Sequence, residues 1–237
     1  MGRCIGVGLG RRGMNVALLA RRSDLLASAA EEAGPDALAV QCDVTDETSV
    51  RAAVEVAAAG LGGIDGLVYC PAVGPLAHIE DVAADTWHQV FATNVIGASI
   101  VTAAALPHLL ESTGTAVYLS SVSAAMTAPW PGLGAYAVSK AALDRLVDAW
   151  RAEHPQLGFT RVTVGDCFGG EGPGLTQFAN SWDPRLFGEF HASWQSRGLL
   201  AGAFIEVQEL VGAVESVLNA GASACIPHIA VIPRPPS

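Results

Sequence analysis

The sequence predicts an α/β fold, with helices on both faces of a doubly wound, mainly parallel sheet. Short apolar runs of strand type alternate along the chain with longer runs of helical apolar periodicity, and the intervals between strands suit crossover helices. The chain has 237 residues, 51% of them hydrophobic, which fits one sizeable core and is short for two domains. Residues 1–237 are therefore expected to form a single domain.

The first element is ambiguous, because a Gly-x-Gly-x-x-Gly pattern occurs at positions 8, 10 and 13. After a strand and before a helix of about ten residues, such a pattern holds a dinucleotide pyrophosphate. The adenosyl-methionine of a methyltransferase is the other ligand that such glycines could hold. Here residues 15–20 follow at once and have the pattern of a strand. Residues 2–12 are therefore interpreted as a first helix that stops at Gly13, and a methyltransferase is the least favoured function.

The later elements are predicted from the spacing of their apolar residues and from the residue types at their boundaries. Asp46 is placed to cap a helix. Strands are expected at residues 15–20, 38–42, 64–70, 117–121 and 160–166. Helices are expected at residues 24–32, 46–57, 85–106, 134–150 and 206–219. A final run at 226–233 contains prolines, so it is expected to be an edge strand.

Charge and cysteine content disfavour several classes of function. The chain has 13 basic and 23 acidic residues, a net charge of −10, which disfavours nucleic acid and anionic membranes as partners. Five scattered cysteines without a Cys-x-x-Cys pair indicate reduced thiols, a cytoplasmic location and no metal site. No apolar signal peptide is expected at the amino end. The uncharged run 89–110 contains several polar residues, so we expect a core helix rather than a membrane span.

Tyr136 and Lys140 lie four residues apart in a predicted helix, so their side chains should share one face. Lys140 is the only lysine in a chain with twelve arginines. An ammonium about 4 Å from a phenol favours the phenolate by about 4 kcal/mol at an effective dielectric near 20. That is about three pKa units, so we predict that Lys140 lowers the pKa of Tyr136 from about 10 towards 7.

Two more polar residues complete a recognisable set. Asn94 lies within an apolar helix, and Ser121 ends a strand 27 residues later. Together Asn94, Ser121, Tyr136 and Lys140 resemble the catalytic tetrad of the short-chain dehydrogenases/reductases, and the resemblance runs from residue 1 to about 220. Ser123 is the alternative to Ser121, which is preferred because it sits at the strand end. From the residues alone, Asn94 is equally well explained as a core asparagine bonded to backbone.

The resemblance implies a Rossmann-like fold and a role for each residue. Ser121 would hydrogen-bond a carbonyl oxygen, Tyr136 would exchange its proton, and Asn94 would keep a water in a proton relay. Lys140 would lower the pKa of Tyr136 and hold the nicotinamide ribose. The implied function is an NADP(H)-dependent oxidoreductase that interconverts a carbonyl and an alcohol by hydride transfer.

The cofactor preference is predicted from the residues at the end of the strand expected at 15–20. Where NAD-specific sites place a carboxylate, this chain has Ala20 followed by Arg21 and Arg22, and guanidinium groups suit a 2′-phosphate. NADP(H) is therefore expected, and NAD(H) less so. The expected cofactor-binding residues are Gly2, Arg21, Arg22, Asp43, Val44, Pro71, Ala72, Tyr136, Lys140 and Thr176.

Two stretches depart from the family's pattern. The family precedes its first helix with a buried strand and a Thr-Gly-x-x-x-Gly-x-Gly loop, of which only Gly2 could match. We expect either a start further upstream or a chain without its central strand, which would leave a gap in the sheet or unpaired backbone. The family's Asn-Asn-Ala-Gly is replaced at residues 69–72 by Tyr-Cys-Pro-Ala, which removes amides that brace the sheet. Both departures favour the rival hypothesis, a non-catalytic binding or scaffolding relative with impaired cofactor binding.

Residues from about 168 to 205 are expected to form a substrate lid. Six aromatic residues lie between positions 177 and 204, where they would line an apolar pocket or a subunit contact. The expected substrate is a small lipophilic carbonyl or alcohol. In similar proteins the helices corresponding to 85–110 and 134–153 form the subunit interface, so a homodimer or homotetramer is expected.

Overall fold

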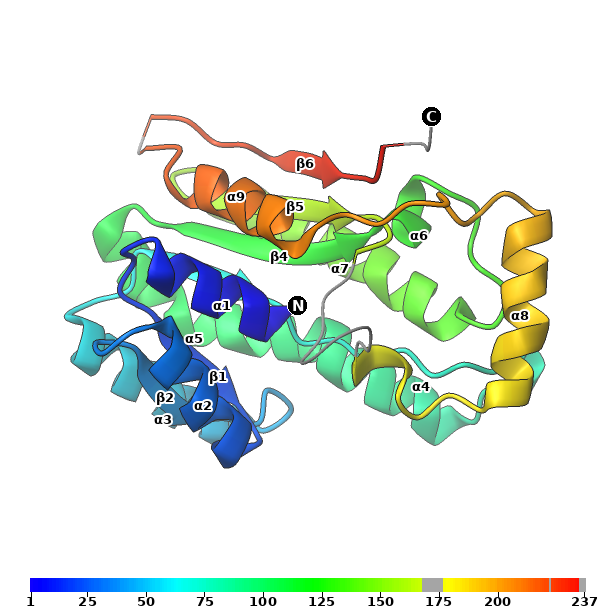
Figure 1. Ribbon diagram of the computed structural model, residues 1–237. Helices are drawn as coiled ribbons and strands as arrows, with labels where there is room; N and C mark the ends of the chain where they lie inside the picture. Colours follow the sequence, from blue (N-terminus) through cyan, green and yellow to red (C-terminus); the bar gives the residue numbers. More distant parts are fainter. Residues whose placement is uncertain (168–176, 222, 235–237) are drawn as a thin grey trace.

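Parallel strands form the middle layer of the molecule in the computed structural model, which describes residues 1–167, 177–221 and 223–234 (Figure 1). Among the described residues every strand pair is parallel, in agreement with the predicted mainly parallel sheet, and the pairs fall into two groups. The first group pairs β1 (Ala17–Ala20) with β2 (Leu38–Gln41). The second has the order β3 (Gly66–Tyr69), β4 (Thr115–Ser121), β5 (Gly158–Val164) and β6 (His228–Val231).

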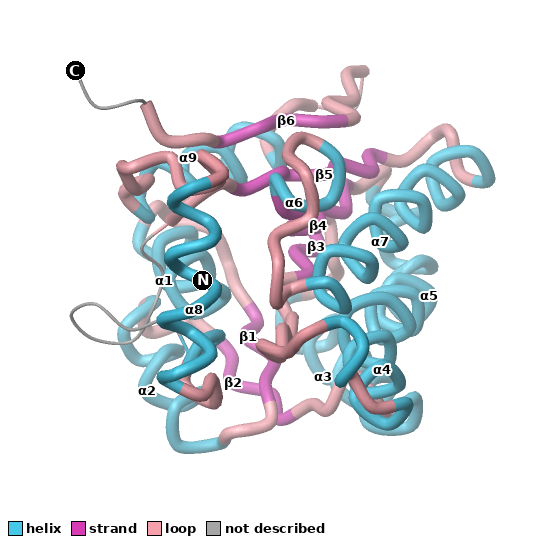
Figure 2. The backbone as a smooth tube through the Cα atoms, turned by 90° about the vertical axis from the view of Figure 1, so that its right-hand side faces the viewer, coloured by secondary structure: helices cyan, strands magenta, loops and turns pink. Residues whose placement is uncertain are grey.

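Helices cover both faces of this layer (Figure 2). One face carries α1 (Gly2–Arg11), α2 (Ser23–Ala33) and α9 (Val207–Leu218), which bury apolar residues such as Ile5 and Leu210. The other carries α3 (Glu47–Leu61), α5 (Gly97–Ser112) and α7 (Gly134–Glu153), which bury residues such as Val50 and Leu143. The prediction that residues 2–12 form a helix, and not a phosphate-binding turn, is confirmed.

The helix boundaries follow local chemistry. Asp46 caps α3 as predicted, because its carboxylate accepts hydrogen bonds from the backbone N–H groups of Thr48 and Ser49. α1 stops before Gly13, whose φ of 91° is a conformation that glycine adopts without steric cost. β6 lies at the end of its sheet, so the expectation of an edge strand is confirmed.

The helix predicted at 85–106 consists of three consecutive segments. α4 (Ala84–Phe91) continues through a π-helical turn, η2 (Ala92–Ile96), into α5. By length and composition alone, residues 84–112 could cross a membrane. That is weak support for a span, because the core helix of a soluble protein passes the same test. The π turn contains Asn94, which is fully buried.

The two groups of strands are separated. Figure 2 shows β6, β5, β4 and β3 in succession, followed after an interval by β1 and β2. Within the described residues, β1 pairs only with β2, and β3 pairs at its other edge only with β4. The gap expected from the sequence therefore lies between β1 and β3.

A helical segment missed by the sequence analysis closes one end of the molecule. α8 (Pro184–Ser196) begins at an Asp183 cap and packs Phe190 and Trp194 against Leu76, Trp130 and Leu133. Shorter helical segments are η1 (Ile79–Asp81), α6 (Val122–Ala125) and η3 (Gln177–Ala179).

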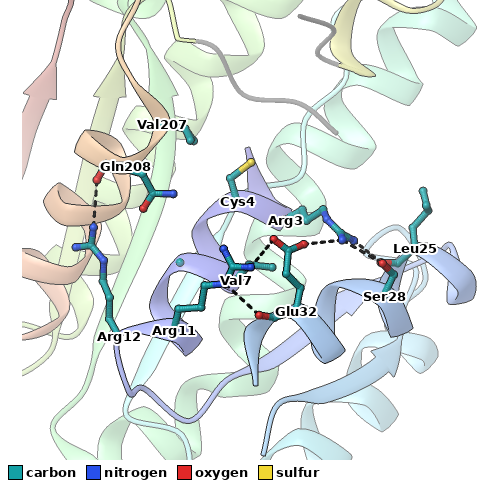
Figure 3. A pocket seen from close by; sticks show the side chains of 11 residues that line it. Arg3, Cys4, Val7, Arg11, Arg12, Leu25, Ser28, Glu32, Val207 and Gln208 are labelled. Carbon is teal, nitrogen blue, oxygen red and sulfur yellow. Dashed lines mark hydrogen bonds and ion pairs between the residues drawn. The ribbon is translucent and has the colours of Figure 1, made fainter. Parts of the chain in front are cut away.

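Ion pairs fix α1 between its neighbours (Figure 3). Arg3 and Arg11 both bind the Glu32 carboxylate on α2, at 2.8 and 3.0 Å. Arg12, just past the end of α1, binds Glu215 on α9 at 2.5 Å and the Gln208 carbonyl. These arginines line a cavity of about 610 Å³, and each is bonded to a described residue. They hold α1 in place.

Candidate active site

Tyr136 and Lys140 lie one turn apart at the start of α7, beside the carboxyl end of β4. Lys140 is 2% exposed, and its ammonium donates a hydrogen bond of 2.7 Å to the Leu119 carbonyl of β4. The ammonium lies 5.8 Å from the centroid of the Tyr136 ring. The predicted placement of the two side chains on one face is therefore confirmed.

The predicted effect of this pair on Tyr136 is wrong for this structure. Burial raises the pKa of Tyr136 to about 12, and only its hydrogen bond with the Ser121 hydroxyl acts in the other direction. The Lys140 ammonium faces the ring and donates to a carbonyl, so its charge does not overcome the loss of solvation at the phenol. Burial also lowers the pKa of Lys140 to about 8. At pH 7 both groups are therefore mainly protonated, with a neutral phenol ready to donate.

Two serines follow β4. Ser121 hydrogen-bonds with the Tyr136 phenol, and its oxygen lies 3.0 Å from that of Ser123. Ser123 is 5% exposed, and its backbone N–H donates to the Ser121 oxygen. This geometry supports the preference for Ser121 as the residue next to Tyr136.

Asn94 is held as a core asparagine. Its side-chain oxygen accepts from the Val73 backbone N–H at 2.8 Å, and its amide donates to the Val73 carbonyl and to the Ser139 hydroxyl. Both N–H groups of the amide are thus used, and no donor is left for a relay water. Asn94 instead ties the segment after β3 to α7, next to Tyr136.

Tyr69 provides a contact in place of the side-chain amides that the family has after β3. Its hydroxyl donates to the Thr93 carbonyl in the π turn, and the side chain is 2% exposed. Gly97 makes this contact possible, because a Cβ there would lie 2.7 Å from the Tyr69 oxygen. Burial raises the pKa of Tyr69, which keeps the phenol a donor. The unusual Tyr-Cys-Pro-Ala segment thus still joins β3 to the helix beside it.

One continuous cavity of about 2260 Å³ joins Ser121, Tyr136 and Lys140 to the carboxyl ends of β1, β2 and β3. All predicted cofactor-binding residues within the described part of the chain line it, and Thr176 lies outside that part. Those residues are Gly2, Arg21, Arg22, Asp43, Val44, Pro71, Ala72, Tyr136 and Lys140.

The residues at the two ends of this cavity fit a nicotinamide dinucleotide. Arg21 and Arg22 are exposed at the end of β1, and neither forms an ion pair within 4.0 Å with a described residue. The first turn of α1 borders the cavity at Gly2, and backbone N–H groups in a first turn have no partner within their helix. The Asp43 carboxylate is bound to its neighbour Thr45, from which it accepts both the backbone N–H and the hydroxyl. These hydrogen bonds lower the pKa of Asp43.

Aromatic residues that the sequence analysis assigned only to a general lid lie directly on this site. The Phe178 ring meets the Tyr136 ring edge-on, with 4.9 Å between centroids. Gly74 admits Phe178, since a Cβ at that position would lie 2.1 Å from the ring. The Trp182 indole donates to the Gly74 carbonyl at 2.8 Å. The side of the cavity nearest Tyr136 is therefore aromatic.

Comparison with known proteins decides the family. The family model described as short chain dehydrogenase matches residues 1–175. The chain belongs to the short-chain dehydrogenase family.

Relatives of the family differ in name and length. A Xanthobacter autotrophicus protein named inactive 2-(S)-hydroxypropyl-CoM dehydrogenase 2 is 34% identical over 155 residues, 65% of this chain and 66% of that protein. The 11-beta-hydroxysteroid dehydrogenase A of Sesamum indicum is 32% identical over 171 residues, 70% of this chain and 49% of that protein. The chain thus spans between about half and two thirds of the length of these two relatives.

A solved structure confirms the fold. The 3-ketoacyl-(acyl-carrier-protein) reductase of Brucella melitensis, complexed with NADH, has a TM-score of 0.81 at 20% identity, covering 98% of this chain and 91% of that one. The Rossmann-like α/β fold predicted from the sequence is therefore confirmed. Among the described residues there is no group of three or more potential metal-binding side chains.

Proposed function

We propose that this short-chain dehydrogenase is an NADP(H)-dependent oxidoreductase that interconverts a small lipophilic carbonyl compound and its alcohol. One observation carries the proposal: Ser121, Tyr136 and Lys140 meet at one end of a cavity that continues to the two exposed arginines of β1. Membership of the family supports the reaction type.

The residues have distinct roles in this proposal. Ser121 and the neutral Tyr136 phenol donate hydrogen bonds to the carbonyl oxygen, and Tyr136 then gives its proton to the developing alkoxide. Lys140 stabilises the resulting phenolate and binds the nicotinamide ribose. Asn94 acts as a positioning residue, because it fixes the Val73 backbone and the Ser139 hydroxyl. The bound nicotinamide supplies the hydride in reduction and accepts it in oxidation.

Phe178, Trp182 and the other aromatic residues around α8 support a lipophilic substrate. They form the wall beside Tyr136, where an apolar group attached to the carbonyl would pack. The net charge of −10 and the scattered cysteines support a cytoplasmic enzyme that binds neither nucleic acid nor anionic membranes.

The direct test is a pair of measurements on the natural chain. NADPH fluorescence is titrated with protein, and NADPH oxidation is followed with a panel of apolar aldehydes and ketones. Saturable binding together with turnover supports the enzyme. Saturable binding of a carbonyl compound without NADPH binding or turnover would favour the non-catalytic alternative.

Replacing Arg21 and Arg22 with alanine is expected to weaken NADPH binding by about 10- to 100-fold and to leave NADH binding unchanged. The reason is that a charge-assisted hydrogen bond to a phosphate contributes about 1.5–3 kcal/mol. Dissociation constants for both nucleotides, measured by fluorescence, check the prediction. The matched control is Arg51→Ala, which removes an exposed arginine paired with Glu47 on α3. Equal weakening of NADH and NADPH binding would contradict the 2′-phosphate assignment.

A homodimer or homotetramer through residues 85–110 and 134–153 is part of the proposal. Ile96 in η2 and Val138 in α7 are 53% and 49% exposed, although both are apolar. Changing both to aspartate is expected to reduce the mass measured by light scattering to that of one chain. Val56→Asp is the matched control, because Val56 is a similarly exposed apolar residue, 56%, on α3, outside the two proposed interface segments. An unchanged mass in the double variant would place the interface elsewhere.

A further inference from the structure

A group of polar side chains lies on the face of the sheet that α7 covers. Ser120 on β4 pairs in register with Thr163 on β5, and Arg161 on β5 pairs with His228 on β6. Tyr118 belongs to the core cluster that contains apolar residues of α7, so alternation along β4 places Ser120 on the same face. The Thr163 hydroxyl lies 2.9 Å from a ring nitrogen of His228. We call Ser120, Arg161, Thr163 and His228 the polar patch.

Asp144 faces the polar patch from α7, one turn after Lys140. It is 8% exposed, and its carboxylate lies 3.8 Å from the Arg161 guanidinium. The Ser120 hydroxyl is close enough to lower the pKa of this carboxyl. Even so, neither the Ser120 oxygen nor Oδ1 of Asp144 forms a hydrogen bond of normal geometry with a described residue. A buried carboxylate with an oxygen left unbonded is costly for folding, which points to a role for Asp144 beyond packing.

The charge of Asp144 acts on Lys140. The two residues are four apart in a helix, and both are buried, where solvent screens charges less than at the surface. Burial lowers the pKa of Lys140, and Cys70 and Asp144 act in the opposite direction. Burial raises the pKa of Cys70 itself to about 11, so Cys70 is a neutral thiol at pH 8. Of these two groups, Asp144 is therefore the one that brings a negative charge to Lys140.

The groups around this pair keep the Asp144 carboxylate ionised. Burial raises its pKa, and four neighbours on α7 and the three strands act against that rise. Those neighbours are Ser120, Arg161, Lys140 and His228. Asp148, one turn further along α7, lies 3.8 Å from the same Arg161 guanidinium. Beside Lys140, the Tyr136 phenol is neutral, because burial raises its pKa to about 12. Arg161 thus provides a positive charge behind Asp144, on the side away from the active site.

We propose that Asp144 is a positioning residue of the active site, whose buried carboxylate keeps the Lys140 ammonium protonated at the pH of the reaction. This role rests on the proposed function, in which a charged Lys140 stabilises the phenolate of Tyr136. Asp144 is not one of the residues that line the cavity, so it acts through Lys140 and not on the substrate. Without this carboxylate, Lys140 would lose its proton at a lower pH, and the phenolate would lose its cation.

The single lysine of the chain makes a direct test possible. Lysine labelled with ¹³C at its ε carbon gives one NMR signal, from Lys140, and titration of that signal gives the pKa of the ammonium. In the natural chain the midpoint is expected near pH 8. Asp144→Asn removes the charge and keeps the shape, so it should lower the midpoint by about one pH unit.

Asp148→Asn is the matched control. Asp148 is an aspartate on the same helix that is bonded to Arg145 and Arg151 and is more exposed than Asp144. Its loss should leave the Lys140 midpoint in place. A midpoint that does not move in Asp144→Asn, or an equal fall in Asp148→Asn, would overturn the proposal. If circular dichroism shows that Asp144→Asn does not fold, Asp144→Ser takes its place with the same expected fall.

The titration uses neither substrate nor cofactor, so its result is separate from that of the proposed reaction. When the chain reduces a carbonyl compound, the fall of kcat at basic pH should move to lower pH in Asp144→Asn by the same amount as the NMR midpoint. A kcat profile that stays in place while the midpoint moves would refute the link to catalysis. Absence of turnover by the natural chain would count against the proposed function, while the NMR shift would still show that Asp144 sets the charge of Lys140.

Discussion

Replacing Tyr136 with phenylalanine is expected to lower carbonyl reduction by about 10²- to 10⁴-fold, the contribution of a positioned general acid. The phenol is the proton donor in the proposed mechanism, and its pKa of about 12 keeps it protonated at neutral pH. The ring remains in the variant, so its edge-on contact with Phe178 is kept and NADPH affinity should change little. Steady-state rates and NADPH titration of the same preparation measure the two effects separately.

Tyr118→Phe is the matched control for this experiment. Tyr118 is fully buried in β4, and its hydroxyl lies 2.6 Å from that of Thr102, away from the cavity. Its loss should cost about 1 kcal/mol of folding stability and leave the rate unchanged. If Tyr136→Phe kept its rate, proton donation by this residue would be refuted even though the family assignment stands.

Replacing Lys140 with methionine is expected to abolish turnover and to leave the folded state as stable as before, or more stable, at pH 7. Burial lowers the pKa of Lys140 from 10.5 to about 8, which corresponds to about 3 kcal/mol against the folded, charged form at neutral pH. Methionine removes that cost and fills a similar volume, while it loses the bond to the Leu119 carbonyl. Activity and denaturant unfolding curves of the variant give the two results.

The pH dependence of this stability difference has a definite sign. Because the pKa of Lys140 is lower in the folded state, the unfolded chain binds more protons between pH 8 and 10.5. The natural chain should therefore gain stability relative to Lys140→Met across that interval, and the difference should level off above it. A difference that stays constant from pH 7 to 10.5 would show that Lys140 is not held in a desolvated site.

The sequence predicted elements whose boundaries have local signals and missed features that depend on packing. Asp46 carries its own capping signal, and the strand pattern that follows at once identified residues 2–12 as a helix. α8 also had a signal that could have been used, since Asp183 caps it and Pro184 occupies its first turn. The π turn at Asn94 had none, because it depends on bonds to Val73 and Ser139 that are distant in sequence.

The prediction for Tyr136 failed for a similar reason. The spacing from Lys140 correctly placed the two side chains on one face of α7. The pKa, however, is set by how deeply the phenol is buried and by the direction of the ammonium's hydrogen bond, and neither is visible in a spacing of four. Arg21, Arg22 and Gly2 were located on the cavity correctly, because strand ends in an α/β fold all meet at one edge.

The aromatic wall beside Tyr136 has a consequence for the speed of exchange between enzyme and solution. Two indole N–H groups of this wall donate hydrogen bonds to backbone carbonyls outside it, Trp182 to Gly74 and Trp194 to Pro131. Opening of at least one of those bonds would widen the route past this wall for a bulky product. We therefore expect departure of the product, rather than chemistry, to limit the steady-state rate for large substrates, so that turnover falls as solvent viscosity rises.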